Sequence, residues 1–155
     1  MSGVPPAVAR FLSGERIAVA GVSRSSSAPA NAIFKRLRET GHEVFAVNPN
    51  AASVEGEPCY RSISDVPGTV DGLMVVTHPR DAELAVKEAL ARGISQVWFH
   101  RSFGQGSVSE SAIAACRAAA VEPIIGGYPL MYCGRIDPAH KAFRWVLRLQ
   151  RRVPG

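Results

Sequence analysis

Short apolar runs alternate along this chain with longer stretches of helical periodicity, and this alternation constrains the fold more than any other feature of the sequence. Each run is apolar at consecutive positions, a pattern typical of strands that helices cover on both faces. Strands alternating with helices are typical of a parallel sheet, because parallel strands need helical crossover connections. The runs lie at 17–20, 44–47, 72–76, 97–99 and 123–125. The sequence therefore predicts an α/β fold with a doubly wound, mainly parallel five-stranded sheet and helices on both faces.

Helical patterns fill the intervals between the predicted strands. We expect helices at 31–40, 62–66 (a single turn), 80–92, 109–119 and 137–151. Asp137 is the expected N-cap of the last helix, and Pro138 suits its first position. The segment 51–60 is expected to be a loop with at most a short edge strand. Neither a linker nor an internal repeat divides the chain, so we expect residues 1–155 to form one domain.

The composition is that of a globular protein, with 46% apolar and 20% charged residues in a chain of 155. None of its apolar runs approaches the roughly 20 residues that span a bilayer. Residues 1–11 contain two prolines and lack the apolar core of a signal peptide. The cysteines Cys59, Cys116 and Cys133 are widely spaced, and we expect them to be reduced. These features together predict a cytoplasmic protein with no membrane partner.

The net charge of +5 reflects 18 basic against 13 acidic residues, with one basic concentration near the end of the chain. That concentration comprises Lys141, Arg144, Arg148, Arg151 and Arg152. Such a run is more often a solvated helix face than a binding site. Aromatic residues do not interleave with it, as they do on surfaces that stack single-stranded nucleic acid. We therefore do not expect nucleic acid as a partner.

Residues suited to a ligand follow the first four predicted strands, the fourth of which is followed by His100, Arg101 and Ser102. Ligands of doubly wound sheets bind beyond the carboxyl ends of the strands, where the strand order reverses. The first such end carries a loop with a glycine, serines, Arg24 and the start of a helix, all suited to phosphate. A plain Ser-rich turn that caps the helix is an equal alternative for this loop taken alone. After the third predicted strand, Pro79 suits either a wall against adenine or an ordinary helix start. His78 is either a hydrogen-bond donor to phosphate or a capped surface histidine.

A nicotinamide or flavin dinucleotide does not fit these loops. Binding of that kind expects G-x-G-x-x-G after the first strand and an acidic residue about 20 residues on, which holds the ribose hydroxyls. Only Gly21 is present in the first loop, and the second strand ends in Asn48-Pro49. Both principal contacts of a dinucleotide are missing.

Four segments resemble the CoA-binding domain family, over a region from about residue 15 to 131. They are Ile17–Ser23, Gly41–Pro49, Val70–Val76 followed by Pro79, and Val97-Trp98. The family is also similar to the N-terminal nucleotide-binding domain of the succinyl-CoA synthetase alpha subunit. The resemblance implies a Rossmann-like domain that binds coenzyme A, or an acyl-CoA, through its adenosine and phosphates.

The resemblance also implies a role for each loop at the strand ends. It implies phosphate contacts from Gly21, Val22, Ser23, Arg24 and Ser25. It implies a border of the adenosine at Val47, Asn48 and Pro49, and an opposite wall at Thr77, His78 and Pro79. Two departures from the family pattern occur, at His100–Phe103 after the fourth strand and at Tyr128, which stands where the family often has a cysteine. Thiol chemistry of that position is therefore not expected here.

A catalytic or metal centre is not predicted. No motif joins Cys133 to His100 or His140, the candidates for a base beside it, and neither metal-ligand spacing nor paired carboxylates occur. We expect a non-catalytic binding protein that acts as a sensor, carrier or subunit. One alternative is a small acyl-CoA or nucleotide-dependent enzyme that uses His100 or Cys133. Another is an interaction module with a vestigial crevice, whose basic last helix meets an acidic protein partner. A homodimer is a further possible assembly.

Overall fold

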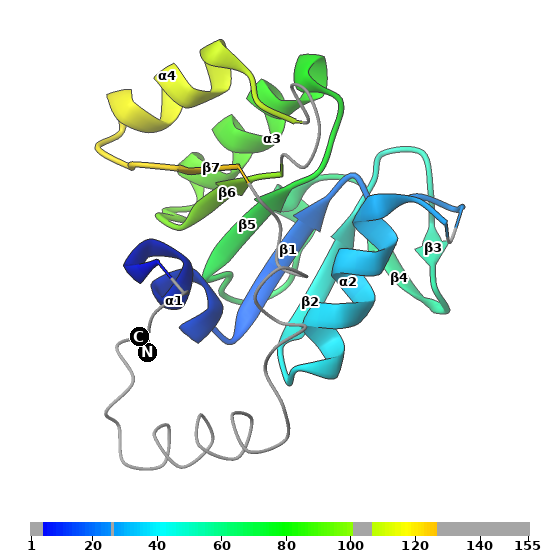
Figure 1. The fold of residues 1–155 in the computed structure, drawn as a ribbon. Coiled ribbons are helices and arrows are strands. Elements are labelled where there is room, and N and C mark those ends of the chain that lie inside the picture. Colours follow the sequence, from blue (N-terminus) through cyan, green and yellow to red (C-terminus); the bar gives the residue numbers. More distant parts are fainter. Residues whose placement is uncertain (1–4, 26, 101–106, 127–155) are drawn as a thin grey trace.

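Seven strands form one sheet at the centre of the fold (Figure 1). The computed structural model describes residues 5–25, 27–100 and 107–126. The strands are β1 (Arg16–Ala20), β2 (Glu43–Val47), β3 (Ser53–Val54), β4 (Glu57–Tyr60), β5 (Gly72–Val75), β6 (Val97–Phe99) and β7 (Ile124–Ile125). Their order is β3-β4-β2-β1-β5-β6-β7. All neighbours pair in parallel except β3 and β4, which are antiparallel.

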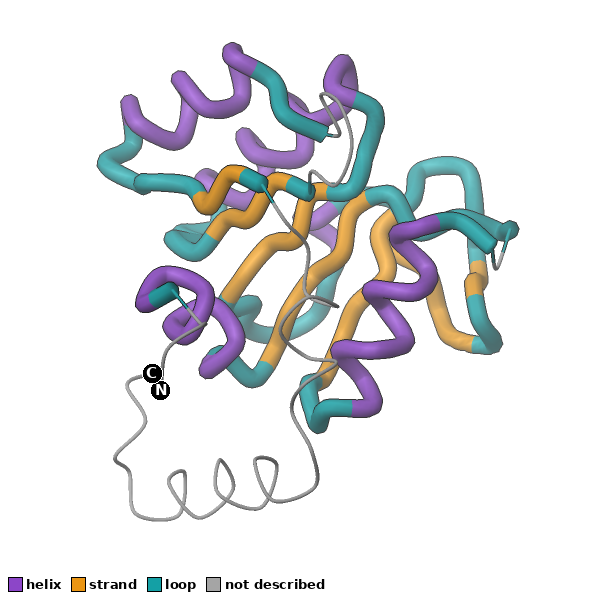
Figure 2. Tube along the Cα trace, viewed as in Figure 1, coloured by secondary structure: helices purple, strands orange, loops and turns teal. Residues whose placement is uncertain are grey.

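The helices cover the two faces of this sheet (Figure 2). They are α1 (Pro6–Ser13), α2 (Pro29–Glu39), the 3-10 turn η1 (Ile63–Asp65), α3 (Pro79–Ala91) and α4 (Glu110–Ala118). Side chains from alternate positions of each strand separate into two cores, one beneath α1 and α2 and one beneath η1, α3 and α4. The fold is thus Rossmann-like, with buried parallel strands that account for the continuous apolar runs of the sequence.

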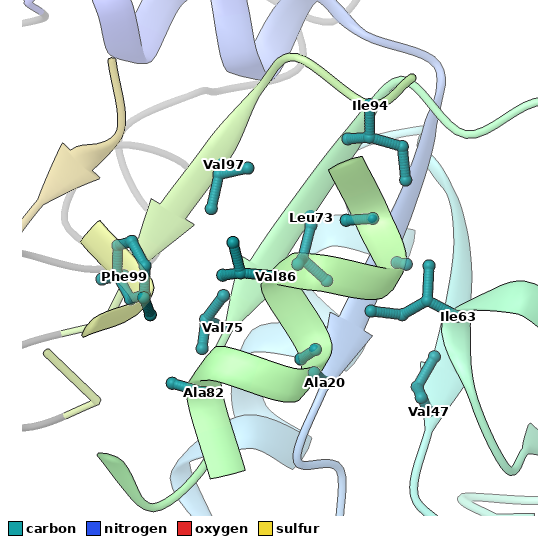
Figure 3. Packing of buried hydrophobic residues seen from close by; sticks show 14 of the residues in the cluster. Ala20, Val47, Ile63, Leu73, Val75, Ala82, Val86, Ile94, Val97 and Phe99 are labelled. Carbon is teal, nitrogen blue, oxygen red and sulfur yellow. The ribbon is translucent and has the colours of Figure 1, made fainter. Parts of the chain in front are cut away.

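Helix α3 shows how one face is packed (Figure 3). Ala82 and Val86 are fully buried and lie over the side chains of Leu73, Val75 and Val97 from the two strands below. Small alanines on the buried stripe of α3 let the helix approach the sheet closely. Since α3 follows β5 directly, this packing also fixes where the end of β5 lies.

The prediction of five strands was wrong, because the segment 51–60 forms the hairpin of β3 and β4. Glu55 and Gly56, with φ of 52° and 74°, make the two-residue turn. Asn-Gly or Asp-Gly is the usual sequence for a turn with two positive φ angles, and Glu-Gly lacks that signal. Strand β3 has only two residues, too few to show an alternating pattern. The five predicted strands all occur at the expected places.

Helix α1 was not predicted, although Val8, Phe11 and Leu12 are buried at helical spacing. Phe11 packs edge-on against Trp98, with ring centroids 5.3 Å apart. The other predicted helices occur within two residues of the expected bounds, and 62–66 contains the 3-10 turn. The predicted helix over 137–151, its basic residues, Cys133 and Tyr128 lie outside the described residues. None of the helices that the structure describes is long and apolar enough to cross a membrane.

Candidate functional site

A cleft of about 380 Å³ opens at the carboxyl ends of β1, β2 and β5. Strand β1 lies between the other two, and the chain reverses its direction of winding between β1 and β5, which is where ligands of such sheets bind. The walls come from the ends of these three strands, from Arg61 after β4, and from α3 as far as Glu88. The lining residues include Gly21, Val47, Asn48, Pro49, Asn50, Arg61, Thr77, His78, Asp81, Leu84 and Glu88.

The predicted site residues take three kinds of position in this geometry. Gly21, Val47, Asn48, Pro49, Thr77 and His78 line the cleft. Ser23, Arg24 and Ser25 continue the loop that leaves it at Gly21, and Pro79 is the first residue of α3. The side chain of Val22 is fully buried in the core beneath α1 and α2, so it faces away from the cleft.

Gly21 allows the ends of β1 and β5 to lie close together. Its φ is +105°, and a Cβ at this position would lie 2.5 Å from the carbonyl oxygen of Val76. Its N–H donates to Val47 O at 3.0 Å, while the N–H of Val76 donates to Ala20 O at 3.0 Å. Any side chain here would strain the backbone and push β5 away. The glycine is therefore required by the contact between strand ends.

Asn31, in the first turn of α2, holds the loop after β1. Its Oδ1 accepts from the N–H of Ser23 at 2.8 Å, and its Nδ2 donates to Ser23 O at 2.7 Å and to Glu55 Oε2 at 2.8 Å. The side chain is fully buried, and these bonds use both amide hydrogens. Within the loop, the N–H of Ser25 donates to Ser23 Oγ at 3.0 Å. The loop has a fixed shape, and the backbone N–H of Ser23 is already bonded within the protein.

Asn31 and Glu55 were not among the predicted site residues. A polar residue on the buried stripe of α2, among Ala30, Ile33 and Phe34, is the one signal in the sequence that points to Asn31. Glu55 is brought to it by the β3–β4 turn. The hydrogen bond from Asn31 and the charge of Lys35, 3.5 Å away, hold the pKa of Glu55 below its usual range. The carboxylate thus stays ionised and supports Asn31.

Asn48 ties the end of β2 to the loop after β1. Its Nδ2 donates to Val22 O at 2.8 Å, and its Oδ1 accepts from the N–H of Asn50 at 2.8 Å, as in an Asx turn. Its own N–H donates to Tyr60 O at 2.8 Å. Dinucleotide-binding folds have an acidic residue at this position, and here Asn48 stands in its place. Its side-chain amide is already hydrogen-bonded to backbone groups of Val22 and Asn50.

The opposite wall begins at Thr77 and His78. His78 is exposed and caps α3, because its Nδ1 accepts from the N–H of Arg80 at 3.4 Å. Ser107 Oγ donates to Thr77 O at 2.6 Å and holds this turn from beneath. On α3, one helical turn after Arg80, Leu84 is 66% exposed and lines the cleft. The wall therefore offers an apolar surface beside a polar rim.

The charges around the cleft favour an anion at the β1 and β4 sides. On the α3 side, Glu88 Oε1 accepts from the N–H of Ile63 at 3.2 Å, and Asp81 lies 3.9 Å from Arg80. Arg24 and Arg61 are exposed, and neither has an ion pair or hydrogen bond with another described residue. Arg61 thus offers an available guanidinium group at a cleft whose acidic groups already have partners, and Arg24 offers a second one in the loop that leaves the cleft.

The nucleophilic and titratable groups of the described segments are not activated. Burial raises the pKa of Cys59 and, together with the charge of Glu122, raises the pKa of Cys116 to about 11. Both thiols therefore stay protonated at neutral pH. Burial lowers the pKa of His100, which favours the neutral imidazole. Within 5–25, 27–100 and 107–126, no three or more His, Cys, Asp or Glu side chains gather as a metal site would need.

Sequence comparison finds a family described as "CoA binding domain", whose model matches residues 15–130. Among curated proteins, the chain is 36% identical over 72 residues to the ADP-forming acetate–CoA ligase I of Archaeoglobus fulgidus, covering 46% of this chain and 10% of the ligase. It is 30% identical over 88 residues to the alpha subunit of the ADP-forming acetate–CoA ligase II of Pyrococcus furiosus, covering 56% of this chain and 19% of that subunit. The chain therefore spans less than a fifth of the length of these relatives.

A solved structure resembles most of the chain. A conserved hypothetical protein from Pyrococcus furiosus superposes with a TM-score of 0.65 and 34% sequence identity, covering 76% of this chain and 97% of the other. Since nearly the whole of that protein is matched, the fold described above also occurs as a small protein by itself.

Proposed function

The chain belongs to the CoA-binding domain family, and on that premise we propose that it binds coenzyme A, or an acyl-CoA, in the cleft at the ends of β1, β2 and β5. The observation that carries the proposal is the position of this cleft. It lies at the reversal of strand order, inside the matched region, and it is lined by Arg61, which bonds no other described residue. The proposed role is that of a non-catalytic sensor, carrier or subunit.

The phosphates are proposed to lie against the loop after β1. Arg24 supplies an unpaired guanidinium there, and the serines at 23 and 25 supply hydroxyl groups. Because Asn31 already bonds both backbone groups of Ser23, the loop does not need to reorganise on binding. Preorganisation of this kind reduces the cost of association. The side chains, more than the backbone N–H of Ser23, then provide the phosphate contacts.

The adenosine is proposed to lie between Asn48-Pro49 and the wall formed by Thr77, His78 and Pro79. Leu84 would meet the face of the base, since an exposed leucine in a cleft offers apolar contact to a flat ring. The alternative of an enzyme on this fold keeps His100 and Cys133 as its candidates. Burial keeps the thiols of Cys59 and Cys116 protonated, so neither adds a nucleophile to these candidates.

Calorimetric titration with CoA, acetyl-CoA, ADP, AMP and NAD tests the proposal. We expect CoA and acetyl-CoA to bind more tightly than NAD, and thermal unfolding to shift upward accordingly. At about 100 times its dissociation constant, a ligand adds roughly 2.7 kcal/mol of stability. Ser23→Asp places a negative charge in the loop after β1, where the phosphates are proposed to lie (the phosphate loop), and should weaken CoA binding. Ser95→Asp, at an exposed serine outside the cleft, carries the same change and should not. Absence of CoA binding at millimolar concentration would refute the proposal, and turnover of acetyl-CoA would refute the non-catalytic role.

A further inference from the structure

Arg61 is a cation at the edge of the cleft, and it is not part of the loop after β1 to which the phosphate contacts were assigned. It follows β4 directly and lines the cleft beside Asn48, Pro49 and Asn50. It also borders a neighbouring hollow of about 400 Å³ next to Cys59. The side chain is exposed, and nothing else in the described part of the chain bonds to it. Its guanidinium is therefore available to a ligand.

Other arginines of the fold are engaged with protein groups. Arg16 bonds Glu43 and backbone carbonyl groups, Arg38 bonds Glu57, and Arg92 bonds the carbonyls of the η1 region. A surface arginine with a nearby acid commonly forms such pairs. The acids that line the cleft with Arg61 are on α3, and one of them, Glu88, is bonded to Ile63.

The register of the sheet places Arg61 beside the end of β2. Strand β4 pairs in parallel with β2, so Val47 lies opposite Tyr60, and Asn48 donates to the carbonyl of Tyr60 at 2.8 Å. Arg61 is the next residue after Tyr60. In Rossmann-type folds, the adenosine ribose lies at the end of the second strand, where an acidic residue holds free hydroxyls or a nearby arginine accommodates a phosphate on the ribose.

The end of β2 has the arrangement that suits a phosphate on the ribose. The residue that follows β2 is Asn48, whose amide is bonded to Val22 and Asn50. A carboxylate for free ribose hydroxyls is thus missing at this strand end, and Arg61, which bonds no other described residue, directly follows the adjacent strand β4. This combination favours a ribose that bears a phosphate.

We infer that Arg61 binds the phosphate on the adenosine ribose and makes the cleft selective for nucleotides that carry it. The inference rests on the proposed coenzyme A site, because CoA bears a 3′-phosphate on this ribose. Arg24 then serves the pyrophosphate at the β1 end, and Arg61 serves the ribose phosphate at the β4 end. The two guanidinium groups divide the anionic parts of one ligand between them.

Binding of CoA and of 3′-dephospho-CoA, which differ in this phosphate alone, tests the inference. Both ligands are titrated by calorimetry at one fixed ionic strength against the wild type, Arg61→Gln and Arg36→Gln. Arg36, on α2, lies outside the cleft and pairs with Glu39, so its substitution makes the same change in net charge. Thermal unfolding without ligand should be the same for wild type and Arg61→Gln, because the replaced side chain is exposed and unbonded.

We expect the wild type to bind CoA about tenfold or more tightly than 3′-dephospho-CoA, since charge-assisted bonds to phosphate are strong. Arg61→Gln should lose this preference by weakening CoA alone, and Arg36→Gln should keep it. Equal affinity of the wild type for both ligands, or a preference that survives in Arg61→Gln, would overturn the role of Arg61 and leave the coenzyme A site standing. If neither ligand bound the wild type, the proposed function itself would fail, and the inference with it.

Discussion

Replacing Asn31 by alanine should release the loop after β1 and destabilise the fold. The substitution removes the bond to the N–H of Ser23 at 2.8 Å and the bond to its carbonyl at 2.7 Å, and it leaves Glu55 without its amide donor. A hydrogen bond contributes on the order of 1 kcal/mol net, and a buried group left unpaired costs more. The two bonds to Ser23 alone therefore predict a loss of about 2 kcal/mol in the free energy of unfolding. For a chain of this size, that corresponds to a fall in Tm of roughly 5 °C.

Urea unfolding measures this change, and Lys35→Ala is the matched control. Lys35 is 45% exposed and Glu55 is 15% exposed, and they meet at 3.5 Å, so the substitution removes a partly exposed ion pair and leaves Asn31 in place. A surface pair contributes about 1 kcal/mol or less, which is below the loss expected for Asn31→Ala. CoA affinity should fall in Asn31→Ala and stay near the wild-type value in Lys35→Ala. An Asn31→Ala protein as stable as the Lys35→Ala protein would show that Asn31 does not hold the loop.

Three further predictions follow from the same contacts. Gly21→Ala should destabilise far more than Gly93→Ala in urea unfolding, because both glycines have positive φ but only Gly21 would bring its Cβ within 2.5 Å of backbone, while Gly93 has open space; equal losses would show that conformation alone matters. Glu55 has a lowered pKa, so its contribution to stability should be complete above its usual pKa of 4.5 and be lost as the pH falls below that value toward the lowered one. Glu55→Gln should therefore unfold with a weaker dependence on pH between 6 and 3, and an unchanged dependence would contradict the shift. Leu84→Asp should lower CoA affinity with little change in the urea midpoint, because this leucine is 66% exposed in the cleft; unaltered affinity would place the base elsewhere.

The phosphate loop is held by side chains more than by its own backbone. Asn31 and Asn48 each bond a backbone carbonyl of the loop, at Ser23 and Val22. Both amides are hydrogen-bonded to neighbouring segments, so they position the loop. Arg61 lines the cleft and Arg24 lies in the loop that leaves it, and neither is bonded to another described residue. Under the proposed function, the asparagines position the loop and the arginines bind the ligand.

The apolar pattern was sufficient to predict the class of fold. Runs such as 17–20 and 72–76 are continuous because helices cover both faces of the sheet, and burial of that kind leaves a direct trace in the sequence. The strand-end loops at Gly21, Asn48 and Thr77 could be located for the same reason, since a loop begins where an apolar run stops. Gly21 was also the correct residue for a tight turn, although its cause, the contact with Val76, lies 55 residues along the chain.

The tertiary structure alone decided which residues meet at the cleft. The hairpin of β3 and β4 has too few residues and too unusual a turn to be visible as a pattern, yet it brings Glu55 to Asn31 and Arg61 to the end of β2. Strand order depends on how helices pack over long distances in sequence, and periodicity records only whether each position is buried. The sequence by itself therefore determined the α/β layering and the ends of the strands, while the packing of the sheet determined the partners of Asn31 and the place of Arg61.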